Sequence, residues 1–221
     1  MIKSFLITLS FSTLLFSSQQ ILLVVADDFN ASTATLTCLE GKKVIFKDIK
    51  VNLGKNGLGW GIGLKNIPHK TGEPIKHEGD KRSPAGIFAL TKNFGNTFYK
   101  NIKMPYLYAD KNLICVDDIN SPFYNQIIEA NGNEKSFEYM RRTDEQYDLG
   151  IVVAHNPHAI KYKGSCIFLH VQKSQNHPTV GCTSMKKADL RKIFHWLNKE
   201  RDPILIQIPK KYLPSIQNIV H

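Results

Sequence analysis

Short apolar runs alternate with polar, Gly- and Pro-containing stretches along most of the chain. The runs are rich in Val, Ile and Phe and have the length of β-strands, while stretches such as GKNGLGWGIG (54–63) and NIPHKTGEP (66–74) have the composition of turns. We expect strands in the runs LTCLE (36–40), KKVIFKDIKVNL (42–53), GIFALT (86–91), LGIVVAHN (149–156), SCIFLHV (165–171) and PILIQI (203–208).

One segment has a helical period. In SMKKADLRKIFHWLNKE (184–200), the apolar residues Leu190, Ile193, Phe194 and Leu197 are spaced to fall on one face of a helix. Ser184 is the expected N-cap, and Asp202-Pro203 ends the run. A second, weaker helix is expected over SPFYNQIIEA (121–130). The pattern therefore predicts a mainly β domain with a few helices.

The first residues have the pattern of an export signal. Lys3 precedes the apolar run of residues 5–16, and Val24-Val25-Ala26 supplies the small residues of a cleavage site before Asp27. A membrane anchor is the alternative, but the polar residues 17–20 interrupt the apolar stretch too early for a good span. We therefore expect cleavage after Ala26.

The remainder suits one domain, because it contains no internal repeat, low-complexity tract or obvious linker. We expect a signal peptide over 1–26, a short N-terminal lead over 27–39, a catalytic domain over 40–210 and a tail over 211–221. The formal net charge of +10 favours an anionic partner such as the cell wall or a membrane face, with which the protein would associate loosely. No nucleic-acid recognition motif is present, so we expect no nucleic-acid partner.

Cys182 has the surroundings of a nucleophile. A thiol reacts as thiolate, so a catalytic cysteine needs a base and an electropositive setting. The thiol lies shortly before the helix expected over 184–200, whose N-terminus favours an anion and predicts a lowered thiol pKa. Gly181 lets the backbone turn, and His170 ends an expected strand; the polar loop of residues 172–179 can bring the two together. Taken singly, a buried structural cysteine and a structural histidine are the commoner cases.

Three segments resemble one family. GSCIFLHVQKSQNHPTVGCTSM (164–185) is similar to the catalytic core of the L,D-transpeptidase (YkuD-type) family, a histidine at a strand end followed by a loop and Ser/Thr-X-Gly-Cys. IKHEGDKRSPAGIFAL (75–90) resembles the upstream Glu-Gly-Asp stretch of that family, and residues 115–125 and 139–156 match a subgroup with a single catalytic domain. The resemblance covers roughly residues 40–208 and implies a YkuD-type β-sandwich or barrel-like domain, with one helix directly after the cysteine.

The resemblance assigns roles in the catalytic core. It implies that Cys182 is the nucleophile and His170 the general base, with the ring oriented by the carbonyl of Val171. The N–H groups of Gly181 and Cys182 would form the oxyanion hole.

Substrate contacts are assigned to Thr179, Ser184 and Arg82, although a structural turn fits Arg82 better than a catalytic role. The chain departs from the family pattern at Val180, where a histidine is usual, and at Ser184, where Asn or Arg is frequent; the loop after the histidine is also shorter. These departures concern substrate contacts and leave the nucleophile and base in place.

The implied activity is that of an exported cell-wall enzyme of the periplasm or cell envelope, with a role in wall biogenesis and cell shape. The thiolate would form a thioester with a peptidoglycan stem tetrapeptide, release D-alanine and pass the acyl group to an amine, without a cofactor or a metal. With water as the acceptor, the same site is an L,D-carboxypeptidase or endopeptidase. A non-catalytic wall-binding module is the other alternative.

A metal site is a different interpretation of the same residues. His155, His158, His170 and Cys182 are ligand types that zinc uses. However, the first two flank a proline in an expected loop, and no carboxylate base follows at a recognised spacing. We therefore expect no metal.

The four cysteines leave the pairing open. If Cys182 stays free, at most one disulfide can form among the other three. Cys115 and Cys166 both lie in segments that match the family subgroup, so the resemblance favours their pairing and leaves Cys38 buried in its strand.

Overall fold

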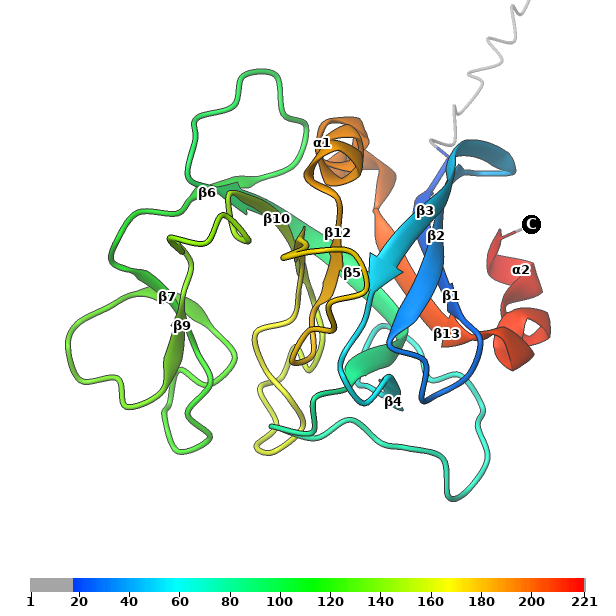
Figure 1. Ribbon diagram of the computed structural model, residues 1–221, viewed down its shortest axis with the longest axis horizontal. Coiled ribbons are helices and arrows are strands. Elements are labelled where there is room, and N and C mark those ends of the chain that lie inside the picture. The colour runs from blue at the N-terminus through cyan, green and yellow to red at the C-terminus, as the bar shows by residue number, and fades with distance from the viewer. Residues whose placement is uncertain (1–17, 221) are drawn as a thin grey trace, which may run out of the picture.

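A closed mixed β-barrel forms the centre of the computed structural model, which describes residues 18–220 (Figure 1). Its eight strands are β1 (Gln20–Ala26), β2 (Thr33–Glu40), β3 (Lys43–Asn52), β5 (Ser83–Gly95), β10 (Leu149–Val153), β11 (Phe168–Val171), β12 (Thr183–Met185) and β13 (Ile204–Pro209). Around the barrel their order is β10-β11-β12-β3-β2-β1-β13-β5, and β5 pairs with β10 to close it. The predicted mainly β class is confirmed.

The longest strand, β5, also carries two short neighbours. Strands β4 (Leu58–Trp60) and β6 (Tyr106–Tyr108) both pair with it in parallel. The six apolar runs predicted as strands all fall on barrel strands. All residues of β13 are buried, which explains why its sequence is continuously apolar rather than alternating. Its one polar residue, Gln207, is buried with its amide bonded to the carbonyl of Pro84 and the hydroxyl of Thr183.

Strand β1 lies in the middle of the barrel wall, antiparallel to β2 and parallel to β13. Ile21, Leu22, Val24 and Ala26 are buried there. Cleavage after Ala26 would remove this strand and leave β2 and β13 without their shared partner. Cleavage after Ala26 stays a prediction, which the pairing of β1 does not favour. Residues 1–17 of the predicted signal peptide lie outside the described residues.

The fold also extends beyond both predicted ends of the catalytic domain. The predicted lead of residues 27–39 contains most of β2, which is a barrel strand. The predicted tail over 211–221 contains most of the 3₁₀ helix η2 (Lys210–Ile216) and the short helix α2 (Gln217–Val220). Tyr212 and Ile216 are buried against the main core, so this segment belongs to the fold.

The predicted C-terminal helix is present, but it starts later than expected. Helix α1 spans Lys187–Trp196 and buries Leu190, Ile193 and Phe194. Its N-cap is Lys186 rather than Ser184, because residues 183–185 pair with β11 and β3 as strand β12. The cysteine is therefore followed by a strand, and the helix comes after it. The helical turn η1 (Lys199–Arg201) follows α1.

A small antiparallel sheet lies beside the barrel, on the side of β10 (Figure 1). It consists of β7 (Leu113–Val116), flanked by β8 (Ile127–Glu129) and β9 (Phe137–Tyr139). The helix predicted over 121–130 is wrong: turns occupy its first half, and β8 occupies the second, because these residues pair with β7. None of the helices between residues 18 and 220 is both long and apolar enough to cross a membrane.

A disulfide joins the small sheet to the barrel. Cys115 of β7 is bonded to Cys166, which lies just before β11, with their Cα atoms 5.9 Å apart. The predicted pairing is confirmed. Cys38 is free and fully buried in β2, as expected, and Cys182 is free as well.

Candidate active site

Cys182 lies directly before β12, beside the strand that carries His170. Strands β11 and β12 run parallel, with Leu169 opposite Thr183 and His170 opposite Ser184. Since side chains alternate along a strand, Cys182 and His170 project from the same face of these neighbouring strands. The sulfur accepts a hydrogen bond of 3.3 Å from the amide of Phe168. The predicted nucleophile and the predicted base are thus held on one surface.

The backbone around Cys182 is fixed by two hydroxyl groups. Its carbonyl accepts hydrogen bonds from Ser83 Oγ (2.8 Å) and Thr179 Oγ1 (2.6 Å). The Ser83 hydroxyl in turn accepts from the amide of Gly54, and the Thr179 hydroxyl accepts from the amide of Gly181 at 3.1 Å. Thr179 therefore holds the loop in front of the nucleophile, and the Gly181 N–H, assigned to the oxyanion hole, already has a partner in this state.

The His170 ring is held on two sides. Its Nδ1 lies 2.8 Å from the carbonyl of Val171, which is the contact expected for an orienting carbonyl. With the Nδ1 proton donated there, the neutral ring keeps Nε2 as its proton acceptor. The ring of Tyr147 packs edge-on against it, with centroids 5.2 Å apart. Burial lowers the pKa of His170 to about 4, so the ring is neutral at physiological pH.

The resting thiol is also neutral. Burial, followed by the negative charge of Glu138, raises the pKa of Cys182 to about 12. The Phe168 amide, the Tyr147 hydroxyl and the ammonium of Lys76 act in the opposite direction but do not outweigh burial. The lowered thiol pKa expected from the sequence is therefore wrong, because the helix whose N-terminus was to stabilise the anion begins only after β12.

A cavity of about 210 Å³ opens beside Cys182. It is lined by side chains from the loop before β5, from the small sheet and from the segments on either side of β11. Its polar lining includes Lys76, Glu78, Asp117, Glu138 and Ser165, and the exposed Val180 lies at its edge. One Asp117 carboxylate oxygen is buried without a hydrogen-bond partner in the described part of the chain. The thiol thus borders a cavity that combines carboxylates with the ammonium groups of Lys76 and Lys81.

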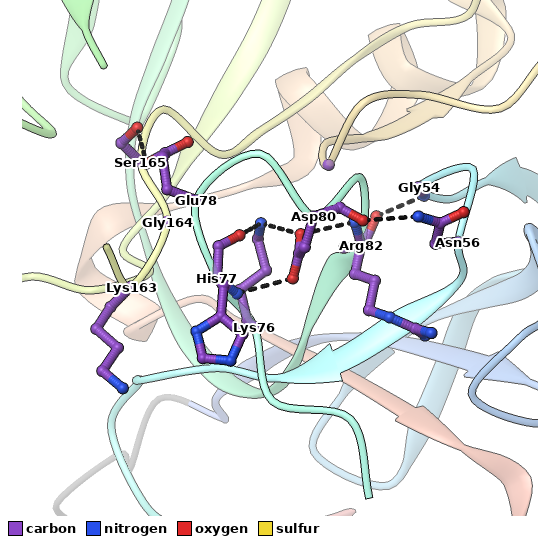
Figure 2. A network of polar contacts seen from close by, with 12 residues as sticks. Gly54, Asn56, Lys76, His77, Glu78, Asp80, Arg82, Lys163, Gly164 and Ser165 are labelled. Carbon is purple, nitrogen blue, oxygen red and sulfur yellow. Dashed lines mark hydrogen bonds and ion pairs between the residues drawn. The ribbon is translucent and has the colours of Figure 1, made fainter. Parts of the chain in front are cut away.

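The loop of residues 75–82 supplies Lys76 to this cavity in a fixed position (Figure 2). The Lys76 ammonium is almost completely buried and donates to Asp80 Oδ1 (2.6 Å) and to the carbonyl of His77 (2.7 Å). Asp80 also accepts from the amides of His77 and Arg82. Glu78 accepts from Ser165 Oγ at 2.7 Å, which ties the loop to the segment before β11.

Two predicted substrate contacts have other partners. The guanidinium of Arg82 donates to the carbonyls of Phe29 (3.0 Å) and Leu58 (2.8 Å), and Figure 2 shows it pointing away from Glu78. Ser184 is buried, and its hydroxyl lies 3.4 Å from the amide nitrogen of Asn52. Neither side chain lines the cavity beside Cys182, and both hold the fold around the site. Their contact with substrate stays a prediction, which burial in β12 and bonding to backbone carbonyls do not favour.

The residues of the alternative zinc site do not assemble. His155 is buried, and its Nε2 lies 2.8 Å from the carbonyl of Lys163. Burial lowers its pKa to about 4. Within residues 18–220, no three His, Cys, Asp or Glu side chains are grouped so that they could hold a metal ion.

Tyr147 and Glu138 are parts of the site that the sequence did not single out. Both lie in a polar, aromatic stretch with no clear period, and they approach Cys182 only because the small sheet packs beside the barrel. Tyr147 lies within the segment 139–156 that matches the family subgroup, which was its one available signal, whereas Glu138 precedes that segment and had none.

A comparison with protein-family models matches residues 26–206 to the model described as YkuD, L,D-transpeptidase catalytic domain. This range contains Cys182, His170 and every residue that lines the cavity beside Cys182. No curated protein and no solved structure matches the chain.

Proposed function

The chain belongs to the YkuD family of L,D-transpeptidase catalytic domains, and from this premise we propose that it is an exported peptidoglycan L,D-transpeptidase. Cys182 is the nucleophile and His170 the general base. The observation that carries the proposal is that the two side chains project from one face of neighbouring parallel segments, with Cys182 at the edge of a cavity.

The reaction begins from a neutral pair. His170 Nε2 takes the proton of the thiol as the sulfur attacks the amide carbonyl that follows the diamino acid of a stem tetrapeptide. The C–N bond breaks, the imidazolium returns its proton to the leaving nitrogen, and D-alanine departs. An amine of a second stem then attacks the thioester and gives its proton to His170, which passes it to the departing sulfur and restores the neutral pair. The product is a cross-link.

The negative charge that develops on the carbonyl oxygen of the substrate needs hydrogen-bond donors. We assign this role to the backbone N–H groups of Cys182 and Gly181. For Gly181 this requires that its N–H leaves the Thr179 hydroxyl, which can keep its own bond to the Cys182 carbonyl. The substrate oxygen thus replaces an internal acceptor.

The cavity and the disulfide support the substrate class and the compartment. A stem peptide carries both ammonium and carboxylate groups, and the cavity presents carboxylates together with Lys76. The bond between Cys115 and Cys166 favours an oxidising environment such as the cell envelope.

Incubation with purified muropeptides, followed by mass spectrometry, tests the proposal. We expect dimers with a 3→3 bond from the parent protein and none from Cys182→Ala or His170→Ala, because either change removes a member of the reacting pair. His177→Ala is the matched control, since this histidine lies in the exposed loop after β11. Loss of D-alanine without dimers identifies the hydrolytic alternative. Unchanged muropeptides would leave the enzyme assignment without support and favour a wall-binding module.

A further inference from the structure

One side chain contacts both members of the proposed catalytic pair. The ring of Tyr147 packs edge-on against His170 at 5.2 Å, and it is almost fully buried among Phe94, Phe168 and Cys182. Its hydroxyl is close enough to Cys182 to lower the pKa of the thiol by hydrogen bonding. The same hydroxyl donates to Glu138 Oε2 at 2.7 Å. Tyr147 therefore connects the imidazole, the sulfur and a carboxyl group.

We propose that Tyr147 is a positioning residue for the Cys182–His170 pair, with its hydroxyl oriented by Glu138 and donated to the sulfur when the thiolate forms. This inference rests on the proposed function, in which Cys182 is the nucleophile. No bond to Tyr147 forms or breaks; the thiol proton still passes to His170.

The hydroxyl has one proton and two acceptors. In the resting state it is donated to Glu138, because a neutral thiol is a weak acceptor. A thiolate is a much stronger acceptor, and a hydrogen bond to an ionised group is about twice as strong as a neutral one. The hydroxyl then turns to the sulfur when Glu138 is protonated, because a Glu138 carboxylate would otherwise stay buried and charged without its hydrogen-bond donor.

Glu138 is suited to this exchange. Burial raises the pKa of its carboxyl group, and the charge of Asp117 adds to the effect, so a proton on Glu138 is stabilised there. A protonated Glu138 donates to the Tyr147 oxygen, which leaves the phenol proton for the sulfur. The chain of donors then runs from Glu138 through Tyr147 to Cys182, and the negative charge that disfavours the thiolate is removed.

The other charged groups around the pair come from several elements. Lys76 approaches the thiol from the loop before β5, and His170 lies on β11. On the other side of Tyr147, the guanidinium of Arg142 lies over the ring, 5.2 Å from its centroid, and is bound by Asp144. Burial raises the pKa of Tyr147 well above its ordinary value, the negative charges of Cys182 and Glu138 act in the same direction, and the positive charge of Arg142 opposes them. The phenol therefore keeps its proton and remains a hydrogen-bond donor.

A packing role alone would not involve the hydroxyl, so Tyr147→Phe separates the two cases. The test is the rate at which iodoacetamide alkylates Cys182, measured across pH by peptide mass spectrometry. We expect Tyr147→Phe to slow alkylation about tenfold near neutral pH and to raise its pH midpoint by about one unit, the size of one hydrogen bond to a charged acceptor. For turnover, kcat should fall with little change in KM.

Tyr212→Phe is the matched control. Tyr212 is a buried tyrosine whose hydroxyl also donates to a glutamate, Glu73, but it lies away from the cavity beside Cys182. We expect its alkylation profile to equal that of the parent.

A second variant keeps the test decisive if Tyr147→Phe does not fold. Glu138→Gln removes a negative charge beside Cys182 and supplies an amide that can donate to the Tyr147 oxygen. We therefore expect faster alkylation than in the parent. Parent-like rates in Tyr147→Phe, or slower alkylation in Glu138→Gln, would overturn the inference. Because alkylation needs no muropeptide, a failure of the proposed function shows itself separately, as absent turnover in the parent.

Discussion

The sulfur of Cys182 accepts a hydrogen bond from the backbone amide of Phe168, two residues before His170 on the same strand. A backbone donor cannot move away without breaking β11, so the thiol is held against the strand that carries its proposed base. The proposed nucleophile is therefore positioned before substrate arrives, although its thiol is not yet ionised.

This arrangement has a consequence for thiol reactivity. With the pKa of Cys182 raised to about 12 by burial, we expect slow alkylation by iodoacetamide at neutral pH and a rise toward alkaline pH. Cys38, whose pKa burial also raises to about 12, is completely inaccessible and should label more slowly still. Mass spectrometry of labelled peptides measures both rates. Rapid labelling of Cys182 that is constant from pH 6 upward would mean that a preformed thiolate exists.

Removal of the Ser83 hydroxyl should weaken both the fold and the site. Ser83→Ala leaves the Gly54 amide and the Cys182 carbonyl each short of one partner, at a cost of about 1–3 kcal/mol. Thermal unfolding measures this loss, and muropeptide turnover should decrease because the nucleophile is held less firmly. Ser215→Ala, at an exposed serine, is the control and should leave both quantities unchanged.

The position of β1 changes the expected mature N-terminus. Because residues 20–26 pair with both β2 and β13, we expect the exported protein to retain them and cleavage to occur upstream of Gln20. The intact mass of the exported protein measures this directly. A chain that begins at Ser18 should unfold cooperatively, whereas one that begins at Asp27 should aggregate. A soluble, active chain that begins at Asp27 would refute the expectation.

The disulfide should contribute substantially to stability. Cys115 and Cys166 are 51 residues apart, and closing a loop of that length stabilises a fold by about 2–4 kcal/mol. Reductant should lower the midpoint of thermal unfolding of the parent protein. It should not affect the double variant Cys115→Ser/Cys166→Ser, which should start at the lower midpoint. Equal midpoints for the parent and the variant would show that the bond adds nothing.

Glu73 should make the protein sensitive to acid. Burial opposes ionisation of its carboxyl group, but hydrogen bonds from Lys211, Tyr212 and Trp60 prevail and lower its pKa to about 2. A lowered folded-state pKa stabilises the fold above the ordinary value of 4.5, and this contribution is lost as the pH falls from 4.5 toward 2. We expect Glu73→Gln to be less stable by about 1–3 kcal/mol at pH 7. Unfolding free energies measured from pH 7 to pH 3 should converge for the two proteins.

The sequence was informative where local pattern decides the structure. The Val- and Ile-rich runs became barrel strands, and the helical spacing of Leu190, Ile193 and Phe194 correctly predicted the buried face of α1. The start of that helix was misplaced because residues 183–185 gain more from pairing with β11 and β3 than from an extra helical turn. Pairing between distant segments has no local signature.

The same limit explains why the strand at the N-terminal end of the described residues was not predicted. Residues 20–26 continue an apolar N-terminal stretch and end in small residues, which is the pattern of a cleavage region, and their partner β13 lies near the other end of the sequence. Within the candidate site, Cys182 and His170 stood out through their motif. Tyr147 and Glu138 did not, since their importance arises from the way the small sheet folds against the barrel.

The parallel pairing of β1 with β13 also governs when the protein can fold. During synthesis β1 emerges early and can pair with β2, but its other edge stays open until the last strand leaves the ribosome. An open strand edge is prone to pair with other chains, and contacts between distant residues form slowly. Completion of the barrel therefore waits for β13, and the open edge of β1 depends on protection from aggregation until that strand is available.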